Sequence, residues 1–357
     1  MQLLNSLHSQ LAALPARLQT SLEDIVNQIE IQSYYAIKHP HYEPVEIPET
    51  VIPRFQLLPV ETQSKHLGLQ LRNFLYGAYY NGSLLPINSD GEQEKLTNNS
   101  VLGVDIALYE NLHKSNQSQG YWSYHWLVVA EEKGGNLLVQ KSGLTLYVEP
   151  FFYQSSVEKD VKVGELINIK LPKNLVQNGF YMAIANAGSQ GDQDVVRIYF
   201  NLTPKGAVAV MENLTSQLNY LSIPFSFKAL YNPDDYRRYD SAVLYFNKHN
   251  CKLVWPVLAR VYTENQAYFC DQVPLFTKQL APGLACAEEP DIKFGEKESF
   301  GTNRCQIIAN GLVSAWEKGN HSSTEKMAAI LHQFNLHRIE LQRPYLNADS
   351  EDIYTPL

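Results

Sequence analysis

Basic side chains occupy unusual positions in a chain that is acidic as a whole. Arg197 lies in a run of Val, Ile and Phe, and Lys228 lies likewise among Phe, Ala and Leu. Three further arginines stand where later elements are predicted to begin: Arg237, Arg238 and Arg304. A cation in apolar surroundings needs water, a carboxylate or an anionic ligand. If these elements are neighbours, their basic groups converge on an anion such as a phosphate.

The same residues permit a purely structural interpretation. Arg197 and Lys228 would then pair with Asp240, Glu288 or other carboxylates, and would only hold the fold together. Arg304 follows a predicted helix start, where unpaired N–H groups and the helix dipole favour an anion. Both interpretations remain open at the level of the sequence.

Motifs for nucleotide, metal or hydrolytic chemistry are missing from the chain. It has no GxxxxGK[ST] phosphate loop, no GxGxxG after a strand, no GxSxG elbow and no HExxH, and its four cysteines include no CxxC pair. His39-x-His41 stands in a proline-rich segment, where exposure is the simpler interpretation. We therefore expect no metal and no cofactor.

Composition limits the class of protein. With 357 residues, 45% of them hydrophobic and 18% charged, the chain can bury a sizeable core. A net charge of -8 argues against nucleic-acid binding, and no apolar run approaches the roughly 18–20 residues that span a bilayer. Four cysteines, all in the last third, favour reduced thiols and a cytoplasmic location.

The first hundred residues predict a helical region with a proline-rich strap. Apolar residues recur at helical spacing in two stretches: Leu3, Leu4, Leu7 and Leu11, then Leu18, Leu22, Ile25 and Ile29. Residues 39–58 have no periodicity and are either a linker or a strap over a surface. A further helix is predicted over about residues 61–80, followed by an exposed loop over 81–99.

Residues 101–357 predict a mainly antiparallel sheet with packed helices, because apolar runs alternate with short glycine-containing turns. The expected strands are Trp122–Ala130, Leu137–Gln140, Leu144–Glu149, Phe180–Ala185, Val195–Leu202, Phe225–Leu230 and Ser241–Phe246. The expected helices follow Thr203-Pro204, cover about Asn303–Lys318, and begin at Ser322 with a Ser322-x-x-Glu325 capping box. The fold class is therefore α+β.

Six segments occur in a characteristic order: Leu75-Tyr-Gly-Ala-Tyr-Tyr, Val196-Arg-Ile-Tyr-Phe-Asn-Leu, Phe227-Lys-Ala-Leu-Tyr-Asn-Pro, Tyr236-Arg-Arg-Tyr-Asp-Ser-Ala-Val-Leu-Tyr-Phe, Pro274-Leu-Phe-Thr-Lys-Gln-Leu-Ala-Pro-Gly-Leu and Ser299-Phe-Gly-Thr-Asn-Arg-Cys. This set of segments resembles the HopA-type family, named for a bacterial type III secreted effector. It also resembles the lyase subunit of class V lanthipeptide and thioamitide synthetases. The resemblance runs over about residues 65–320, so the first 60 residues lie outside it.

The order of elements is also similar, more distantly, to the phosphothreonine lyases. That resemblance implies that Lys228 is the base that removes the α-proton. It implies that Arg197, Arg237, Arg238 and Arg304 bind the substrate phosphate. Tyr199 stands where those enzymes have the histidine acid, and a tyrosine, with an ordinary pKa near 10, is a weaker acid at neutral pH. Supporting roles are assigned to Asn201, Asp240 and Lys278.

The resemblance implies a metal-independent phosphoserine or phosphothreonine lyase. It would act on a precursor peptide in lanthipeptide-type biosynthesis and leave dehydroalanine or dehydrobutyrine. β-Elimination needs a base, an acid and neutralisation of the phosphate charge, and arginines crowding a lysine favour its neutral form. The chain lacks kinase motifs, so a separate kinase is an expected partner. One alternative is a non-catalytic module that binds a phosphopeptide or a partner; another is an enzyme for a different anion, such as a prenyl diphosphate.

Overall fold

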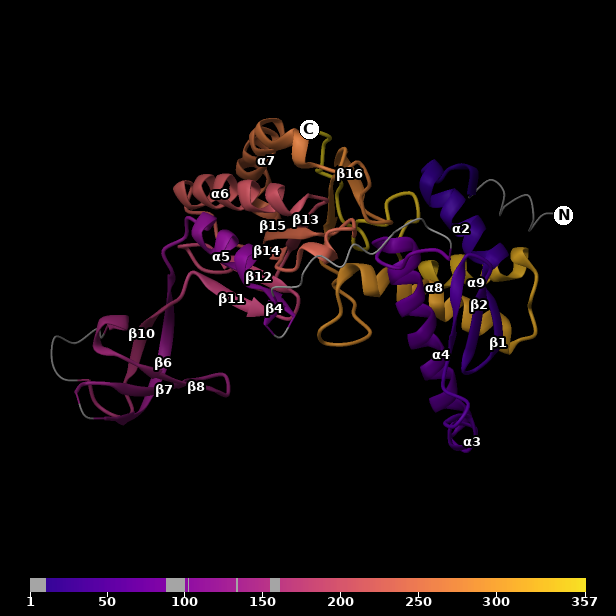
Figure 1. Ribbon diagram of the computed structural model, residues 1–357, viewed down its shortest axis with the longest axis horizontal. Coiled ribbons are helices and arrows are strands. Elements are labelled where there is room, and N and C mark those ends of the chain that lie inside the picture. Colours follow the sequence, from indigo (N-terminus) through magenta and orange to yellow (C-terminus); the bar gives the residue numbers. More distant parts are fainter. Residues whose placement is uncertain (1–10, 88–99, 102, 133, 155–160) are drawn as a thin grey trace.

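The computed structural model describes residues 11–87, 100–101, 103–132, 134–154 and 161–357. Figure 1 shows a central sheet with helices above it, a small sheet that projects from it, and a helical part that contains the N-terminal region. Helices and mainly antiparallel sheets make an α+β fold, which confirms the predicted class. None of the helices in the described part of the chain has both the length and the apolar character needed to cross a bilayer.

Seven antiparallel strands form the central sheet. Their order is β11-β12-β14-β15-β13-β17-β16. The strands are β11 (Asn174–Gln177), β12 (Phe180–Ile184), β13 (Val195–Phe200), β14 (Phe225–Leu230), β15 (Ala242–Asn247), β16 (Lys278–Ala281) and β17 (Leu284–Glu288). The strands predicted from Phe180 to Phe246 are thereby confirmed to within two residues at each end. In the sheet, β14 lies between β12 and β15. Strand β13, which precedes β14 in the sequence, lies on the far side of β15.

The pairing register fixes which side chains share a face of this sheet. Lys228 pairs with Val243, which pairs with Tyr199, so these three side chains point to the same side. Ser226, Tyr245 and Arg197 form the next row on that side. Successive side chains of a strand alternate between faces. The residues between them, including Phe227, Leu244 and Ile198, therefore point to the opposite face, where each is fully buried.

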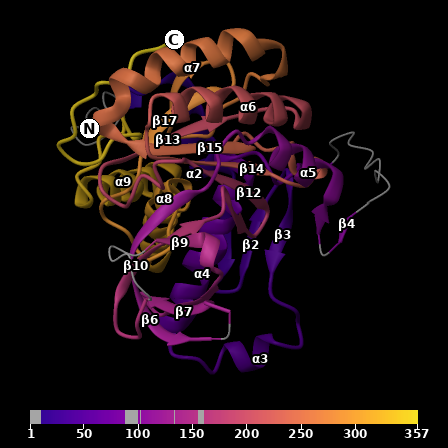
Figure 2. The same ribbon diagram turned by 90° about the vertical axis from the view of Figure 1, so that its left-hand side faces the viewer.

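Helices α5 (Ile106–Ser115), α6 (Pro204–Tyr220) and α7 (Cys251–Asn265) cover that opposite face (Figures 1 and 2). Helix α6 begins as predicted, with the Thr203 side chain accepting from the Gly206 N–H and with Pro204 in the first turn. Together the sheet and these helices bury one large apolar core.

Two further helices, α8 (Phe300–Glu317) and α9 (Ser323–Leu336), follow the sheet in sequence. Both begin with a capping box, at Ser299 and at Ser322. The box at Ser322 is the predicted one, whereas α8 begins three residues before the predicted Asn303. Gly301 lies in the first turn of α8, where an added Cβ would be 2.3 Å from the Tyr80 ring. A glycine here lets that ring pack against the helix and reach the central sheet.

A second, smaller core belongs to the projecting sheet, whose strand order is β8-β7-β6-β10-β9. Its strands are β6 (Tyr121–Glu131), β7 (Leu137–Lys141), β8 (Leu144–Val148), β9 (Tyr153–Gln154) and β10 (Leu166–Leu171). A single 3-10 turn, η2 (Pro150–Phe152), precedes β9. The predicted hairpin of Trp122–Ala130 with Leu137–Gln140 is confirmed as β6 and β7, and Trp126, Val128 and Val139 form the centre of the core.

The N-terminal region packs on the last helices rather than standing apart. Its elements are α2 (Ala16–Gln28), β1 (Glu30–Ser33), β2 (Ala36–His39), β3 (Tyr42–Glu46), α3 (Ile52–Phe55), α4 (Val60–Leu75) and a π-helical turn η1 (Tyr76–Tyr80). Helix α2 contacts α9, and α4 contacts α8. Residues of this region share the large core with the central sheet. A two-stranded sheet of β4 (Ser100–Val101) and β5 (Val104–Asp105) leads into α5.

Residues 39–58, expected to be either a linker or a strap over a surface, contain regular secondary structure. This segment holds β3, which completes a three-stranded antiparallel sheet with β1 and β2, and it holds the short helix α3. Short strands that contain proline carry no clear period, so only the partner strand reveals them. The helix predicted over 61–80 is confirmed as α4 and η1. The helix predicted around Leu3–Leu7 and most of the predicted loop over 81–99 lie outside the described residues.

Candidate functional site

Lys228 is half-buried on the face of the central sheet that α6 and α7 leave uncovered. Its Nζ lies 4.3 Å from the centre of the Phe180 ring and 5.5 Å from the centre of the Tyr245 ring. Within the part of the chain that the structure describes, no carboxylate forms an ion pair with it. An ammonium over aromatic faces is held by the ring quadrupoles. The two rings therefore position the lysine, and no carboxylate of the described residues pairs with its charge.

Arg238 follows the 3-10 turn η3 (Pro233–Asp235) and lies beside the same Phe180 ring, with its Cζ 5.7 Å from the ring centre. Its Nε and Nη2 donate to the two carboxylate oxygens of Asp240, at 2.6 and 2.9 Å. Asp240 also accepts from the Tyr76 hydroxyl at 3.2 Å and from the Asn81 side-chain amide at 3.3 Å. This bidentate pair fixes the plane of the guanidinium and leaves its Nη1 uncommitted to Asp240.

The electrostatics of this pair favour its charged form. Burial would raise the pKa of Asp240, but the adjacent Arg238 and the more distant Lys228 bring that pKa below its ordinary value. Burial would likewise lower the pKa of Arg238, and Asp240 raises it above the ordinary value instead. Asp240 is thus a carboxylate that orients Arg238, with two side chains from residues 76–81 holding it in place.

Arg197 is the third cation near these aromatic rings. Its Cζ lies 5.0 Å from the centre of the Tyr245 ring, on the ring that Lys228 also contacts. Its Nε donates to Glu289, so the structural interpretation holds for this arginine, with Glu289 as the carboxylate. Burial would raise the pKa of Glu289, but Arg197 and Lys293 lower it.

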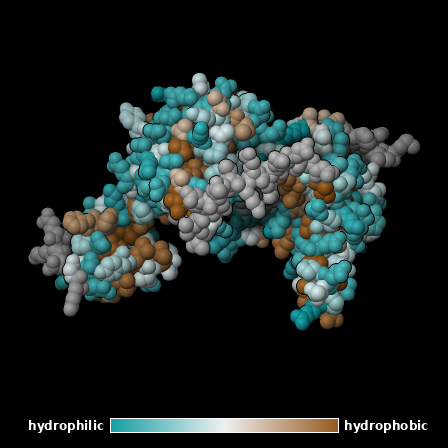
Figure 3. Space-filling view, in the orientation of Figure 1, coloured by the Kyte–Doolittle hydropathy of each residue, from teal (hydrophilic) through white to brown (hydrophobic). Residues whose placement is uncertain are grey.

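Three cations and two aromatic rings therefore alternate across the face opposite α6 and α7, where Arg197 is buried and Lys228 and Arg238 are half-buried. We call this set the cation row, and it consists of Arg197, Tyr245, Lys228, Phe180 and Arg238. The two rings were missed from the sequence. Tyr245 lies in a predicted strand, but only the register with β13 and β14 reveals that it faces Arg197 and Lys228. Figure 3 shows the molecule hollowed beneath the central sheet, between the small sheet and α4.

Tyr199 lies on the same face but outside the cation row. Val243 stands between it and Lys228 in the register, so two strand spacings, about 9–10 Å, separate their backbones. Its side chain is 2% exposed, and its hydroxyl makes no hydrogen bond to another described residue, although the Tyr80 hydroxyl is near. Burial raises its pKa above the ordinary value. A substrate on the open face does not reach this hydroxyl.

Arg304 lies within the protein, away from the cation row. It is 1% exposed, and its guanidinium donates to the carbonyls of Pro344 and Leu346 and to the Asn303 side chain. Burial lowers its pKa to about 10. The expected phosphate ligand is thus a clamp that holds the segment after α9 against α8.

The remaining predicted residues also lie apart from the row. Lys278 pairs with Cys286 and hence points to the opposite face of the sheet, where it bonds Asp352 at 2.7 Å. Asn201 is buried and donates to the Gln272 carbonyl. Arg237 is exposed at the turn before β15. Of the nine predicted residues, the structure therefore brings together Arg197, Lys228, Arg238 and Asp240.

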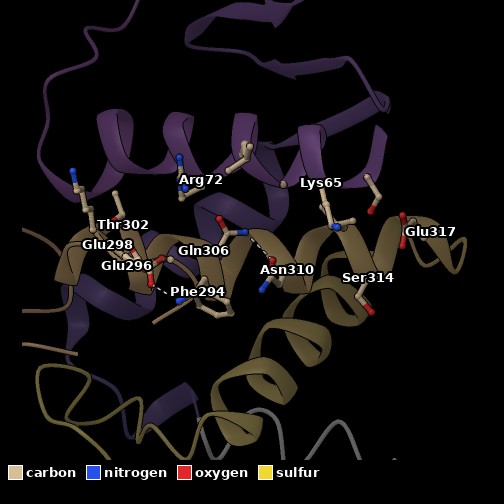
Figure 4. Close-up of a pocket in the computed structure, with 16 residues that line it drawn as sticks. Lys65, Arg72, Phe294, Glu296, Glu298, Thr302, Gln306, Asn310, Ser314 and Glu317 are labelled. Atoms are coloured by element: carbon tan, nitrogen blue, oxygen red, sulfur yellow. Dashed lines mark hydrogen bonds between the residues drawn. The ribbon is translucent and has the colours of Figure 1, made fainter. Parts of the chain in front are cut away.

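A groove with a volume of about 760 Å³ lies between α4 and α8 (Figure 4). Lys65 and Arg72 face Thr302, Gln306 and Asn310 across it, and Gln306 donates to Asn310 at 2.8 Å. No residue of the cation row lines it. The volume of this groove therefore does not identify the functional site, because Arg238, Asp240 and Glu289, whose pKa values are shifted, do not line it.

Metal-binding and redox groups are not clustered in the described residues. No group of three or more His, Cys, Asp or Glu side chains there is arranged to hold a metal ion. All four cysteines are free thiols, three of them buried and Cys270 exposed.

Comparison with known proteins identifies the part of the chain that carries the row. Residues 171–346 match the HopA1 effector protein family. This region belongs to that family. The HopA1-family region contains all five residues of the cation row and Asp240, whereas Tyr76 and Asn81, which hold Asp240, precede it.

Two solved structures align with part of this chain. The effector protein from Pseudomonas syringae pv. tomato strain DC3000 aligns with a TM-score of 0.38 and 18% identity, over 47% of this chain and 63% of the effector. The effector from Pseudomonas syringae pv. syringae strain 61 aligns with a TM-score of 0.37 and 18% identity, over the same shares of each chain. This chain thus covers less than two thirds of either effector. A comparison with the curated proteins finds no match.

Proposed function

We propose that this protein is a phosphoserine or phosphothreonine lyase that acts on a phosphorylated peptide. The observation that supports this most is Lys228, a half-buried lysine without a carboxylate partner among the described residues. It lies between two arginines, Arg197 paired with Glu289 and Arg238 held by both oxygens of Asp240. A base flanked by oriented phosphate ligands is what β-elimination of phosphate requires.

The reaction would follow from these positions. Lys228 Nζ takes the proton from Cα of the phosphorylated residue. The electron pair of that C–H bond forms the Cα=Cβ double bond, the Cβ–O bond breaks, and phosphate leaves. Arg197 and Arg238 stabilise the charge that develops on the leaving phosphate, using donors not committed to their carboxylates. The product is a dehydroalanine or dehydrobutyrine residue.

The peptide would come from a separate kinase, because the chain carries no kinase motif. We place this chemistry in the maturation of a ribosomal, lanthipeptide-type precursor in the cytoplasm. The resemblance of the HopA-type segments to the lyase subunits of such systems supports this assignment.

The test is mass spectrometry of a synthetic phosphothreonine peptide incubated with the purified protein. Elimination removes phosphoric acid and leaves an unsaturated residue, whereas hydrolysis returns threonine, so the two products differ in mass by one water. Lys228→Met keeps an unbranched stem between the rings and removes the amine. Lys205→Met, at an exposed position of α6, is the matched control. Equal turnover by wild type and Lys228→Met contradicts the proposed role of Lys228.

A second function is favoured by the pairing of both arginines. Because Arg197 and Arg238 already hold carboxylates, the row can act as a binding surface that recognises a phosphorylated peptide without converting it. Tight phosphate-dependent binding by fluorescence anisotropy, lost in Arg238→Gln and accompanied by no change in peptide mass, favours this second function.

A further inference from the structure

The proposed elimination lacks a proton donor at the position the sequence suggested. Tyr199 is sealed between Tyr80, Phe300 and the sheet, and Val243 separates it from Lys228. We infer that Tyr245 donates the proton to the departing phosphate. This inference rests on the proposed function.

Tyr245 has the position that a donor needs. It is half-buried on β15, directly between Arg197 on β13 and Ser226 on β14, on the same sheet face as Lys228. Its ring contacts the guanidinium of Arg197 and the ammonium of Lys228. A phosphate bound between these two cations therefore lies at the Tyr245 side chain. Tyr199, by contrast, lies in the same register row as Lys228 but is separated from it by Val243, and its side chain is buried.

Two cations lie beside the Tyr245 ring, and a phosphate that they bind is within the same group of side chains. The charged and titratable groups that face Tyr245 are Arg197 on β13, Lys228 on β14, Glu289 after β17, which Arg197 neutralises, and the buried Tyr199. Ser226 is engaged with Gln190 at 2.9 Å and does not compete as a donor.

The step balances in atoms and charge. As the Cβ–O bond breaks, the leaving oxygen takes the Tyr245 proton, so the dianionic phosphate ester departs as hydrogen phosphate rather than as a trianion. Lys228 has meanwhile taken the Cα proton and is an ammonium. Transfer of that proton from Lys228 to the tyrosinate, directly or through water, restores both groups. The net change is loss of hydrogen phosphate and formation of the double bond.

The inference is tested by the pH dependence of a rate ratio. Elimination from the phosphothreonine peptide is measured for wild type, Tyr245→Phe and Tyr199→Phe, between about pH 5 and pH 8, on either side of the second phosphate pKa of about 6. Phosphopeptide affinity is measured for each variant by fluorescence anisotropy.

We expect Tyr245→Phe to slow elimination about 100-fold near pH 8, where the ester is a dianion and needs a proton to leave. The deficit shrinks towards pH 5, because the monoanion already carries a proton. Phosphopeptide affinity stays within about 2-fold, and Tyr199→Phe stays within about 2-fold of the wild-type rate. A merely structural role of Tyr245 would not give a deficit that follows phosphate ionisation.

Three outcomes overturn the inference. If Tyr245→Phe matches wild type at every pH while Lys228→Met is inactive, the lyase stands and another group is the donor. If its deficit is the same at every pH, Tyr245 is a positioning residue and not the acid. If wild type itself causes no elimination, the proposed function fails, and the inference fails with it.

Discussion

The two faces of the central sheet carry the same kinds of cation and use them differently. On the face covered by α6 and α7, Lys278 bonds Asp352 and so ties the last residues of the chain to β16. On the opposite face, Lys228 lies beside the Phe180 and Tyr245 rings. It forms no ion pair with a carboxylate of the described residues. The ammonium of Lys278 is thus engaged in a structural ion pair. The amine of Lys228 has no ion-pair partner among the described residues and is available to a ligand.

The arginines repeat this contrast. Arg304 is satisfied by two backbone carbonyls and an amide and is sealed from solvent. Arg238 is held by one carboxylate and remains on the open face, 22% exposed at its side chain. The comparison teaches that residue type does not distinguish a structural cation from a candidate ligand. The identity of its partners and its access to solvent do.

The largest expected effect is a difference in elimination rate between two single variants, in which Lys228 or Lys278 is replaced by Met. We expect Lys228→Met to lower elimination by about 10³-fold through loss of the base, with phosphopeptide affinity retained. Lys278→Met should keep the rate within about 2-fold and cost about 1 kcal/mol of stability, since it loses one partly exposed ion pair. Rates from mass spectrometry and urea unfolding measure the two effects. Similar rate losses in both variants would contradict the comparison.

Removing the sealed arginine should affect stability next most. Arg304→Met leaves buried carbonyls of Pro344 and Leu346 without donors, and we expect the free energy of unfolding to fall by about 3 kcal/mol. Arg237→Met, at an exposed arginine, should change it by less than about 0.5 kcal/mol. Urea denaturation of both variants is the measurement. A stable Arg304→Met protein that has lost only phosphopeptide affinity would restore Arg304 as a ligand.

The stability contributed by the Arg238–Asp240 ion pair should depend on pH. The folded-state pKa of Asp240 is depressed, so its stabilisation is complete above the ordinary carboxyl pKa of about 4 and is lost as pH falls through the lowered value. Asp240→Asn should therefore cost about 2 kcal/mol near neutral pH. The difference from wild type should shrink below about pH 4. A difference that is constant with pH in urea unfolding contradicts this assignment.

The smallest expected effect separates two tyrosines of the same π-helical turn. Tyr76 bonds Asp240 in the site, and Tyr79 bonds Asp24 at 2.6 Å outside it. Each Tyr→Phe change should cost about 1 kcal/mol of stability. Only Tyr76→Phe should raise KM for the phosphopeptide, by about 3-fold with kcat unchanged, because Arg238 then loses part of its support. Equal KM values in both variants would remove Tyr76 from the site.

Local signals in the sequence predicted most of the central fold. Alternating apolar residues define β13, β14 and β15, and side-chain caps at Thr203 and Ser322 define the starts of α6 and α9. These features depend on a few neighbouring residues, so a single sequence displays them. The β1–β3 sheet was missed because its short strands are stabilised by one another and not by their own pattern.

The site was only partly within reach of the sequence. Residue types and order pointed to Lys228, Arg197, Arg238 and Asp240, and the structure brings these four together. They also pointed to Arg304, Lys278 and Tyr199, which the structure places inside the protein, on the other face and out of reach. Sequence order does not encode register, and register decides which side chains of different strands share a face.

The sequence by itself determined the α+β class, the strands and the helix between Phe180 and Phe246, and the presence of cations in apolar strands, because these depend on residue type and spacing. The tertiary structure alone decided that β15 lies between β13 and β14, which puts Tyr245 between Arg197 and Lys228. It also decided which cations are neutralised, since a buried charge is stable only with partners that distant parts of the chain supply.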